Sequence, residues 1–363
     1  MMLNRHDTQL VIEKLIDSLV SIQDEDGRYL QRLSDGRVVD TKGWKGWEWT
    51  HGIGLFGLFR YQQLTGSVRA QETIAAWFRD RFAEGTPVKN VNTACPFLTL
   101  ALCYEETKTP EWKPYLEAWG DWLYRKMPRT DEGCFQHVTY ENDHWQQIWD
   151  DTLMMAVLPL AKMGQLFNRP QWVEEAKFQF MQHIVYLTDR HTGLWYHGWN
   201  FDGRHHFAGA LWARGNSWIT IAIPEFLEML DLSADDAFRR QLCHVLEAQV
   251  RALQRCQQDN GLWPTLLDDP DSYAEASASA GFAAGILKAI RLGYLADEYL
   301  LVAERALEGV VNHITPQGEL TQVSFGTAMG NNLDHYRQIP LTSMPYGQAM
   351  AMLCLVESLR LHL

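Results

Sequence analysis

The segment TDEGCFQHVTYENDHWQQIWDDTLMMAVLPLAKMGQLF, residues 130–167, shows the pattern on which the fold depends. A glycine follows acidic residues, a polar and aromatic connection follows the glycine, and the segment ends in a helix that is apolar on nearly every face. Such a helix has to be surrounded by other protein elements, because its apolar faces would otherwise contact water. The segment therefore predicts a helix that lies inside a larger helical assembly.

The same pattern occurs six times along the chain. Glycines in similar surroundings recur 48 to 68 residues apart, at positions 27, 85, 133, 193, 261 and 318. A one-sided helix is predicted before each glycine, at about 8–22, 68–83, 112–127, 170–188, 235–257 and 298–314. A helix that is apolar nearly all round is predicted after each connection, at 53–64, 94–106, 152–167, 217–230, 279–295 and 347–359. A repeat of this length indicates an array of similar units.

The two kinds of helix predict an all-α fold. One-sided helices belong on the outside, and helices apolar on most faces belong on the inside. Six of each in strict alternation predict an (α/α)6 barrel of six inner and six outer helices, with residues 1–363 as a single catalytic domain. An open helical solenoid is the alternative. We favour the closed ring, because six units suit it and no polar capping repeat is visible.

The composition of the chain limits which partners and which cellular compartment we expect. The chain has 45 acidic and 32 basic residues, a net charge of −13, which argues against nucleic acid and anionic membranes as partners. No run of 18 uncharged apolar residues predicts a membrane span, and the N-terminus does not resemble a signal peptide. Six cysteines without a CxxC pair indicate free thiols in the cytoplasm. We expect a monomer or a homodimer.

Polar and aromatic residues gather where the inner helices begin. In a barrel these starts meet at one mouth, and the glycine-led connections lie beside them. The residues concerned are Trp47, Trp49, His51, Asn90, Asn92, Asp150, Asp151, Arg214, Asn216, Glu275, Ser277, Ser279, Tyr346 and Gln348, with His137, Trp195, His197 and Trp199 from the connections. Aromatic side chains mixed with hydrogen-bonding groups are typical of carbohydrate sites. The free N–H groups of the helix starts favour a bound anion.

Several of these residues also have structural interpretations. Asp150 is a suitable cap for a helix that starts near Thr152, and one cap needs only one aspartate, which leaves Asp151 for another role. We expect Trp149 to belong to the core. A half-buried Arg214 needs an anionic partner, either a protein acid or a ligand carboxylate. No HxxxH motif or paired cysteines occur, so we expect no metal site and no cofactor.

Seven segments occur in an order and spacing that resemble a known group of enzymes. They are WEWTHGIGLFGLFR, NVNTACPFLTLAL, GCFQH, WQQIWDDTLMMAVLPLAK, TGLWYHGW, LWARGNSWI and SASAGFAAGI. The chain resembles the unsaturated glucuronyl and rhamnogalacturonyl hydrolases of glycoside hydrolase families 88 and 105, and more closely family 105. The resemblance also implies an (α/α)6 barrel.

The resemblance implies roles for individual residues. A W-x-D-x-x-M segment holds the catalytic aspartate of these families, and here it points to Asp151. Substrate-binding positions of the family match His137, His197, Arg214 and Trp218. Members often carry a second aspartate where this chain has Asn92, which we expect to orient water or a hydroxyl group in catalysis. We add Trp47, Trp49 and His51 as expected substrate contacts, because they lie at the start of the first inner helix.

The implied substrate is an unsaturated uronic-acid oligosaccharide, produced by a polysaccharide lyase and carrying a C4=C5 double bond. In the mechanism that we expect, protonated Asp151 gives its proton to C4, water adds at C5, and the next sugar leaves. Rhamnose beside the unsaturated uronate, as in pectin degradation, would be typical of family 105. Burial among aromatic residues should keep Asp151 partly protonated and give a mildly acidic pH optimum.

Two other functions are compatible with a helical barrel. Sugar epimerases of the N-acylglucosamine 2-epimerase kind share the fold and use paired histidines, a role in which His137 and His197 could act. A non-catalytic scaffold would instead need an exposed apolar groove for a protein partner. The Asp151 segment and the polar rim favour the hydrolase over both.

Overall fold

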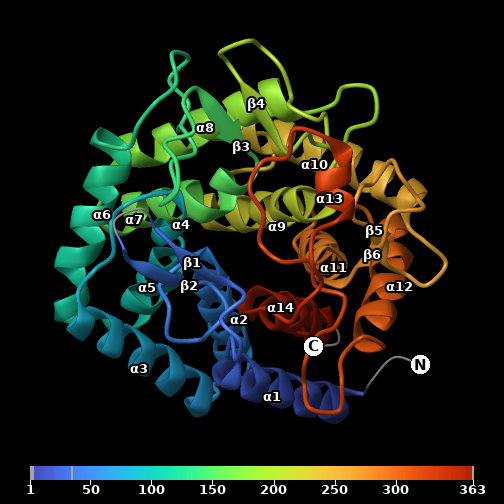
Figure 1. Cartoon of the computed structure of the whole chain (residues 1–363), viewed down its shortest axis with the longest axis horizontal. Helices are drawn as coiled ribbons and strands as arrows, with labels where there is room; N and C mark the ends of the chain where they lie inside the picture. Colours follow the sequence, from blue (N-terminus) through green and yellow to red (C-terminus); the bar gives the residue numbers. More distant parts are fainter. Residues whose placement is uncertain (1–3, 34–35, 362–363) are drawn as a thin grey trace.

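The computed structural model describes residues 4–33 and 36–361, and its centre is a ring of six helices. Each inner helix packs against the next in chain order, and the last packs against the first, so the ring is closed (Figure 1). This closure confirms the (α/α)6 barrel and excludes the open solenoid. The inner helices are α2 (Trp49–Thr65), α5 (Pro96–Thr107), α7 (Leu158–Leu166), α9 (Ala213–Leu230), α11 (Ala276–Arg291) and α14 (Pro345–Leu361).

Six further helices surround the ring and agree with the predicted outer set to within a few residues. They are α1 (Arg5–Ser21), α3 (Val68–Glu84), α6 (Lys113–Arg125), α8 (Pro170–Leu187), α10 (Ala237–Cys256) and α12 (Leu300–Val311). Shorter helical segments complete the fold: α4 (Val91–Ala94), α13 (Leu333–Arg337), the 3-10 turns η1 (Pro110–Trp112) and η3 (Asp297–Tyr299), and a π-helical turn η2 (Leu153–Val157).

The six repeated glycines lie in the turns that connect each outer helix to the next inner helix. All six have positive φ, between 67° and 100°, a conformation that other residues adopt at a cost. A Cβ atom on Gly261 would lie 2.1 Å from the carbonyl oxygen of Arg305 in α12, and one on Gly318 would lie 2.1 Å from that of Lys14 in α1. Gly318, the last of the six glycines, thus packs closely against α1, the first outer helix. The last repeat therefore contacts the first.

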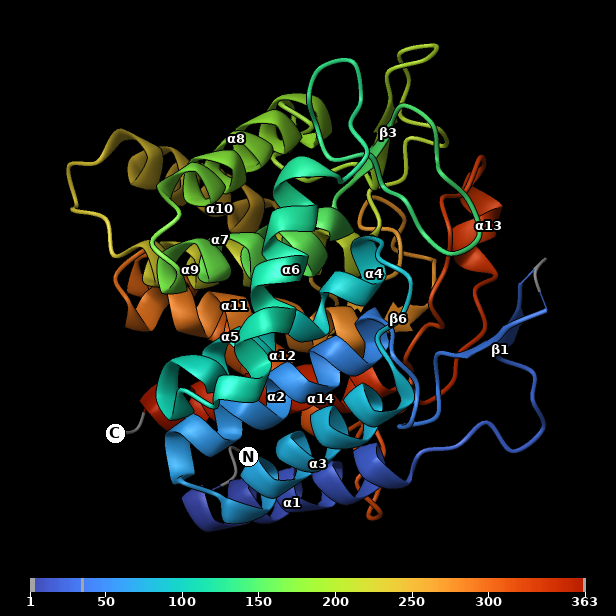
Figure 2. The ribbon, with the colours of Figure 1, turned by 90° about the vertical axis from the view of Figure 1, so that its left-hand side faces the viewer.

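Three short antiparallel strand pairs lie in the connections. They are β1 (Leu30–Arg32) with β2 (Val38–Asp40), β3 (Gln147–Trp149) with β4 (Gly198–Asn200), and β5 (Trp263–Pro264) with β6 (Ala274–Glu275). Figure 2 shows β1, β3, β6 and α13 together at one end of the barrel, the end at which α4 leads into α5. The connections and strands therefore build a rim around the mouth of the barrel.

The opposite end of the barrel is closed by charged side chains, of which Glu105 is exposed and the others are buried or nearly buried. Around the ring each inner helix contributes a residue whose sign alternates with that of its neighbours: Arg60, Glu105, Lys162, Glu225, Lys288 and Glu357. The Nζ atom of Lys288 lies 2.6 Å from a carboxylate oxygen of Glu225 and 2.6 Å from one of Glu228. Arg60 also pairs with Glu225. These ion pairs join helices that are not adjacent in sequence and so fix their register.

Two expectations about the chain as a whole can be compared with the structure. All six cysteines are free, as the absence of a CxxC pair suggested. Within residues 4–33 and 36–361 no helix is both long enough and apolar enough to cross a membrane.

Lys288→Met tests the charged end of the barrel. The lysine side chain is 4% exposed, and removing it leaves Glu225 and Glu228 with Arg60 as their remaining cation. Loss of one partner of a buried ion pair costs about 3–5 kcal/mol. We expect the free energy of unfolding in urea to fall by that amount. Lys177→Met is the control, because its pair with Glu174 is on the surface and should be worth about 1 kcal/mol or less. Equal losses in the two variants would contradict a stabilising role for the ring.

Candidate active site

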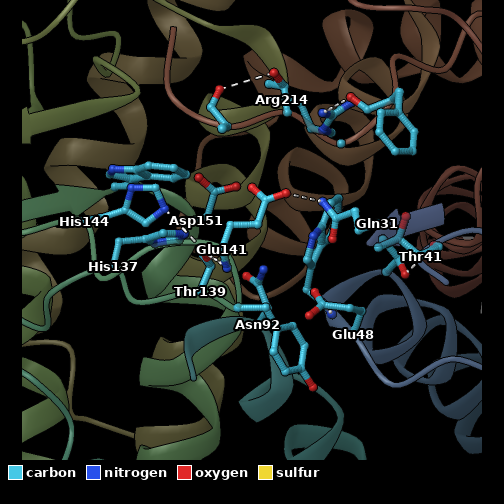
Figure 3. Close-up of a pocket in the computed structure, with 18 of the residues that line it drawn as sticks. Gln31, Thr41, Glu48, Asn92, His137, Thr139, Glu141, His144, Asp151 and Arg214 are labelled. Carbon is cyan, nitrogen blue, oxygen red and sulfur yellow. Dashed lines mark hydrogen bonds between the residues drawn. The ribbon is translucent and has the colours of Figure 1, made fainter. Parts of the chain in front are cut away.

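A pocket lies at the mouth where the inner helices begin, with about 750 Å³ of space between protein atoms (Figure 3). Its walls come from segments that are far apart in sequence. The residues that define its chemistry are Gln31, Glu48, Trp49, Asn92, His137, Tyr140, Glu141, His144, Trp149, Asp151, Trp212, Arg214 and Phe325. Five predicted site residues thus face one space: Trp49, Asn92, His137, Asp151 and Arg214.

The β3–β4 pair places Asp151. Trp149 of β3 lies opposite Gly198 of β4, and the N–H of Asp150 donates to the carbonyl of His197 at 3.0 Å. This pairing brings the Asp151 Oδ2 atom to 3.3 Å from the His197 Nε2 atom. A π-helical turn follows at once, and Pro159 just beyond it has no N–H to form the regular helical bond. Such turns are frequent at functional sites.

His197 supports Asp151 from behind. Its side chain is 1% exposed and is not part of the pocket wall. Its Nδ1 atom lies 2.7 Å from the hydroxyl oxygen of Tyr336, and its ring packs against Trp212 at 4.5 Å. Burial lowers the pKa of His197, so the imidazole is neutral near pH 7. His197 was predicted as a substrate contact, and in the structure it lies beside Asp151 without lining the pocket.

Asp150 is fully buried and does not cap the helix. Neither of its carboxyl oxygens has a hydrogen-bond partner within the described part of the chain. The carboxyl group packs on Gly215 of α9, where a Cβ atom would lie 2.3 Å from the Asp150 Oδ2 atom. Burial raises the pKa of Asp150 well above its usual range, and the charge of Asp151 raises it further. The prediction of a capping aspartate was wrong, because the side chain turns inward to α9.

The pKa values of Asp150 and Asp151 are shifted in opposite directions. Burial tends to raise the pKa of Asp151, but the contact with His197, whose neutral ring can donate from Nε2, and interactions with His137 and with the neutral carboxyl group of Asp150 outweigh it and lower that pKa below its usual range. The neutral form is therefore favoured on Asp150 and the charged form on Asp151. This differs from the expectation that Asp151 itself is partly protonated, because the expectation considered burial and omitted the two imidazoles.

Neutral aromatic rings form the wall beside Asp151. The ring of His137 stacks on Trp149, with 4.0 Å between ring centres, and its Nδ1 atom lies 2.8 Å from the Thr152 hydroxyl oxygen. Burial lowers the pKa of His137 to about 3 and that of His144 to about 4. Trp149 faces the pocket, although the sequence suggested a core position. Stacked neutral rings of this kind suit the face of a sugar.

Arg214 is the arginine of the pocket wall, and its head group is already partly engaged. It donates to the carbonyl oxygens of Ser324 at 2.5 Å and Phe325 at 2.9 Å. The Glu275 carboxylate, also fully buried, lies 3.9 Å away. The sequence analysis left two partners open for this arginine, a protein acid and a ligand carboxylate. In the structure the protein acid is present, as Glu275. The guanidinium also holds the 324–325 segment against the pocket.

Besides His197, three predicted substrate contacts do not line the pocket. Trp47 donates its indole N–H to the Thr93 carbonyl at 3.0 Å. The His51 Nε2 atom lies 2.7 Å from the Gly43 carbonyl oxygen, and the residue is fully buried. Trp218 is also fully buried and packs edge-on against Trp49 at 5.8 Å. These side chains support the mouth from below, while Trp49, stacked on Tyr346 at 4.6 Å, carries the aromatic surface.

Sequence reasoning missed several pocket residues. Glu48 lies between Trp47 and Trp49, and the argument that selected those two tryptophans would have selected it as well. Gln31 and Glu141 come from irregular segments, where the Gln31 side chain donates to the Glu141 carboxylate at 3.1 Å. No periodic pattern marks such residues, so nothing in the sequence indicated that they meet.

Within the described residues one group has the composition of a possible metal site. One potential ligand atom from each of Asp150, Asp151 and His197 lies within 4.8 Å of the others. The other nitrogen of His197 is already close to Tyr336, and Asp150 does not reach the pocket wall. The absence of a metal requirement therefore stays a prediction.

Comparison with known proteins connects this site to a family. The family model described as Glycosyl Hydrolase Family 88 matches residues 21–362. Unsaturated rhamnogalacturonyl hydrolase YesR of Bacillus subtilis is 28% identical over 86% of this chain and 90% of its own length. A possible member of family 105 from Salmonella enterica is 59% identical, with a TM-score of 0.99 over 100% of this chain and 96% of that one. A family 105 hydrolase from C. acetobutylicum shares the fold at 22% identity, with a TM-score of 0.81 over 96% and 98% of the two chains.

The match to the family model covers nearly the whole chain, and it includes the segments that place Asp151, His197 and Arg214 in the site. This chain therefore belongs to the glycoside hydrolases of the family 88 group and, within that group, to family 105.

Proposed function

We propose that the protein removes an unsaturated uronyl residue from a short oligosaccharide by hydrating its C4=C5 double bond. The observation that carries this proposal is the adjacent pair of acids at an aromatic pocket: Asp151 lines the pocket, Asp150 is buried beside it, and their pKa values are shifted in opposite directions, so that the pair can hold one proton. The name of its relative from Bacillus subtilis supports rhamnose as the next sugar, and hence an unsaturated galacturonyl-rhamnose substrate.

The reaction needs one proton donor and one water molecule. Asp151 gives its proton to C4, and positive charge develops at C5 and the ring oxygen. Water then adds to C5 and returns a proton to Asp151. The hemiketal at C5 opens, the bond from C1 to the next sugar breaks, and that sugar leaves as an alcohol. One water is consumed, and the carboxyl group ends in the state in which it began.

Substrate binding places the proton where it is needed. The uronate brings a negative charge into the pocket, and a like charge nearby disfavours the ionised form of Asp151. The proton then moves from Asp150 to Asp151, which faces the substrate. His197 keeps the accepting oxygen in place throughout.

Other pocket residues hold the sugar. Arg214 provides positive charge for the uronate, and the rings of Trp49, Trp149 and Trp212 provide apolar surfaces for the pyranose faces. Asn92 has the amide groups to orient water or a hydroxyl. No step of this scheme uses a metal or a cofactor. We also propose a cytoplasmic location, which the six free thiols support.

The epimerase alternative requires two histidines at the reacting carbon. His137 lines the pocket, whereas His197 lies behind Asp151 with both ring nitrogens next to protein oxygens. This arrangement favours the hydrolase. Disappearance of the alkene absorbance, without a change of configuration in a saturated amino sugar, would separate the two activities.

Asp151→Asn tests the proton donor. An amide of the same shape cannot protonate C4, and general acid–base catalysis contributes about 10²–10⁴ in rate. We expect kcat on unsaturated galacturonyl-rhamnose to fall by that factor, followed as loss of the alkene absorbance. Asp143→Asn, an exposed acid on the neighbouring loop, should leave kcat unchanged. Wild-type turnover retained by Asp151→Asn would remove Asp151 from the mechanism.

The pH profile tests the shared proton. The reactive pair carries one proton, which is lost when the pH rises through the raised pKa of Asp150, so kcat should fall on the alkaline side. In Asp150→Asn the proton on Asp151 must come from solvent, and because the pKa of Asp151 is low, the maximum should move to lower pH. Identical profiles for wild type and Asp150→Asn would show that Asp150 does not hold the proton.

Arg214→Ala tests the uronate contact. Loss of a charge-assisted hydrogen bond costs about 1.5–3 kcal/mol, which corresponds to roughly a 10- to 150-fold loss in kcat/KM. The variant also leaves Glu275 without its cation, so the melting temperature has to be measured alongside. Arg337→Ala, which breaks surface pairs with Asp269 and Asp334, is the control. An unchanged kcat/KM in folded Arg214→Ala would exclude the contact.

A further inference from the structure

A second carboxyl group faces the pocket from a different inner helix. Glu48 is the residue before α2, and its side chain is nearly fully buried. One carboxyl oxygen accepts from the N–H of Trp49 at 3.3 Å, whereas the other has no partner among residues 4–33 and 36–361. Figure 3 shows Glu48 and Asn92 on one side of the pocket and Asp151 on the other. The carboxyl group therefore offers an unused oxygen to whatever the pocket holds.

Helix capping explains only half of this carboxyl group. Glu48 forms a reciprocal cap with His51, whose Nδ1 atom accepts from the Glu48 backbone N–H at 3.1 Å. That cap uses one side-chain oxygen, and shorter residues such as serine or aspartate are preferred at this position. A buried polar oxygen without a partner is costly, by about 1–3 kcal/mol for a typical group. The longer glutamate side chain is consistent with a second use at the pocket.

The group is a neutral acid over most of the physiological range. Burial raises the pKa of Glu48 to about 8. The Trp49 N–H and the neighbouring Asn92 amide, which forms no hydrogen bond of regular geometry to the carboxyl group, oppose this rise, and the charge of Glu141 adds to it. A protonated carboxyl can donate a hydrogen bond without repelling a uronate. Asn92 fits this arrangement, because an aspartate there would place a second acid next to Glu48.

We propose that Glu48 is a substrate-binding residue whose free carboxyl oxygen hydrogen-bonds hydroxyl groups of the unsaturated sugar, beside Asn92 and across the pocket from Asp151. The proposal rests on the proposed function, because it takes the bound molecule to be an unsaturated uronyl saccharide. In this proposal Glu48 and Asn92 together bind the polar groups of the sugar and so hold its double bond next to Asp151.

The buried titratable neighbours of Glu48 stay neutral, so ionisation of Glu48 should be the change that controls substrate binding. Burial raises the pKa of Cys95 well above its usual range and that of Tyr140 above its own, so both stay neutral. Burial lowers the pKa of His51 to about 4, which makes it neutral as well. Glu141 faces Glu48 as an acid on the exposed loop. Ionisation of Glu48 above pH 8 would put a buried charge beside the uronate and weaken binding.

The test measures KM and kcat separately from pH 6 to pH 9.5 on unsaturated galacturonyl-rhamnose. For wild type we expect KM to rise above about pH 8 as Glu48 ionises. Glu48→Gln cannot ionise, so its KM should not rise in that range. Glu48→Ala should raise KM by about 2- to 12-fold at pH 7, the value of one hydrogen bond between neutral groups. Asp236→Ala, which removes the cap of α10 far from the pocket, controls for the loss of a helix cap.

The outcomes separate the two proposals. A KM that rises with pH equally in wild type and Glu48→Gln would overturn the role of Glu48 and leave the proposed function intact. The role of Glu48 would also be overturned if Glu48→Ala lowered the melting temperature, as Asp236→Ala is expected to do, but left KM unchanged. A wild-type protein that neither consumes nor binds a panel of unsaturated uronyl disaccharides would overturn the proposed function, and the role of Glu48 with it.

Discussion

Closure of the inner ring is the constraint on which the rest of the structure depends. Helices that are apolar nearly all round can be covered on every side only if each packs against two inner neighbours and an outer helix. The contacts are close: a Cβ atom on Gly285 would lie 2.1 Å from the Thr220 carbonyl oxygen in α9, and one on Gly57 would lie 3.0 Å from Ala349 in α14. Once the ring is closed, all six helix starts share one mouth. Residues that are more than 100 positions apart, such as Arg214 and Ser324, then become partners.

The two ends of the ring treat buried charge in opposite ways. At the closed end, Lys288 and Glu225 are almost fully buried and satisfy each other at 2.6 Å. At the mouth, Asp150 and Glu48 are equally buried, yet each keeps at least one oxygen without a partner in the described residues. Native proteins satisfy most buried polar groups, and exceptions need an explanation. The contrast within one ring shows that the fold can pair its charges, and that the mouth is built for groups that come from outside.

Periodicity was sufficient to predict the barrel but could not orient individual side chains. The inner and outer helices follow from one-sided and all-round apolar patterns. Rim position pointed to Trp49, Asn92, His137, Asp151 and Arg214, which line the pocket, but equally to Trp47, His51 and His197, which do not. Whether a residue at a helix start faces the pocket or the core depends on contacts made by another unit of the repeat. Asp150 turns inward because Gly215 leaves room for it, and His197 lies behind Asp151 because β3 pairs with β4. The loop residues Gln31 and Glu141 carry no pattern at all.

The buried carboxyl group of Asp150 costs the fold stability and serves the proposed site. The Asp150 side chain adds no hydrogen bond to the fold among the residues described, and it needs a glycine at position 215, since any side chain there would collide with its carboxyl group. An apolar residue of similar size in its place would remove the cost of burying an acid without a partner. It would also leave Asp151 ionised with no neighbouring acid to supply a proton. The pair is therefore better explained by the proton transfer that we propose than by stability, and Gly215 supports the site by leaving room for Asp150.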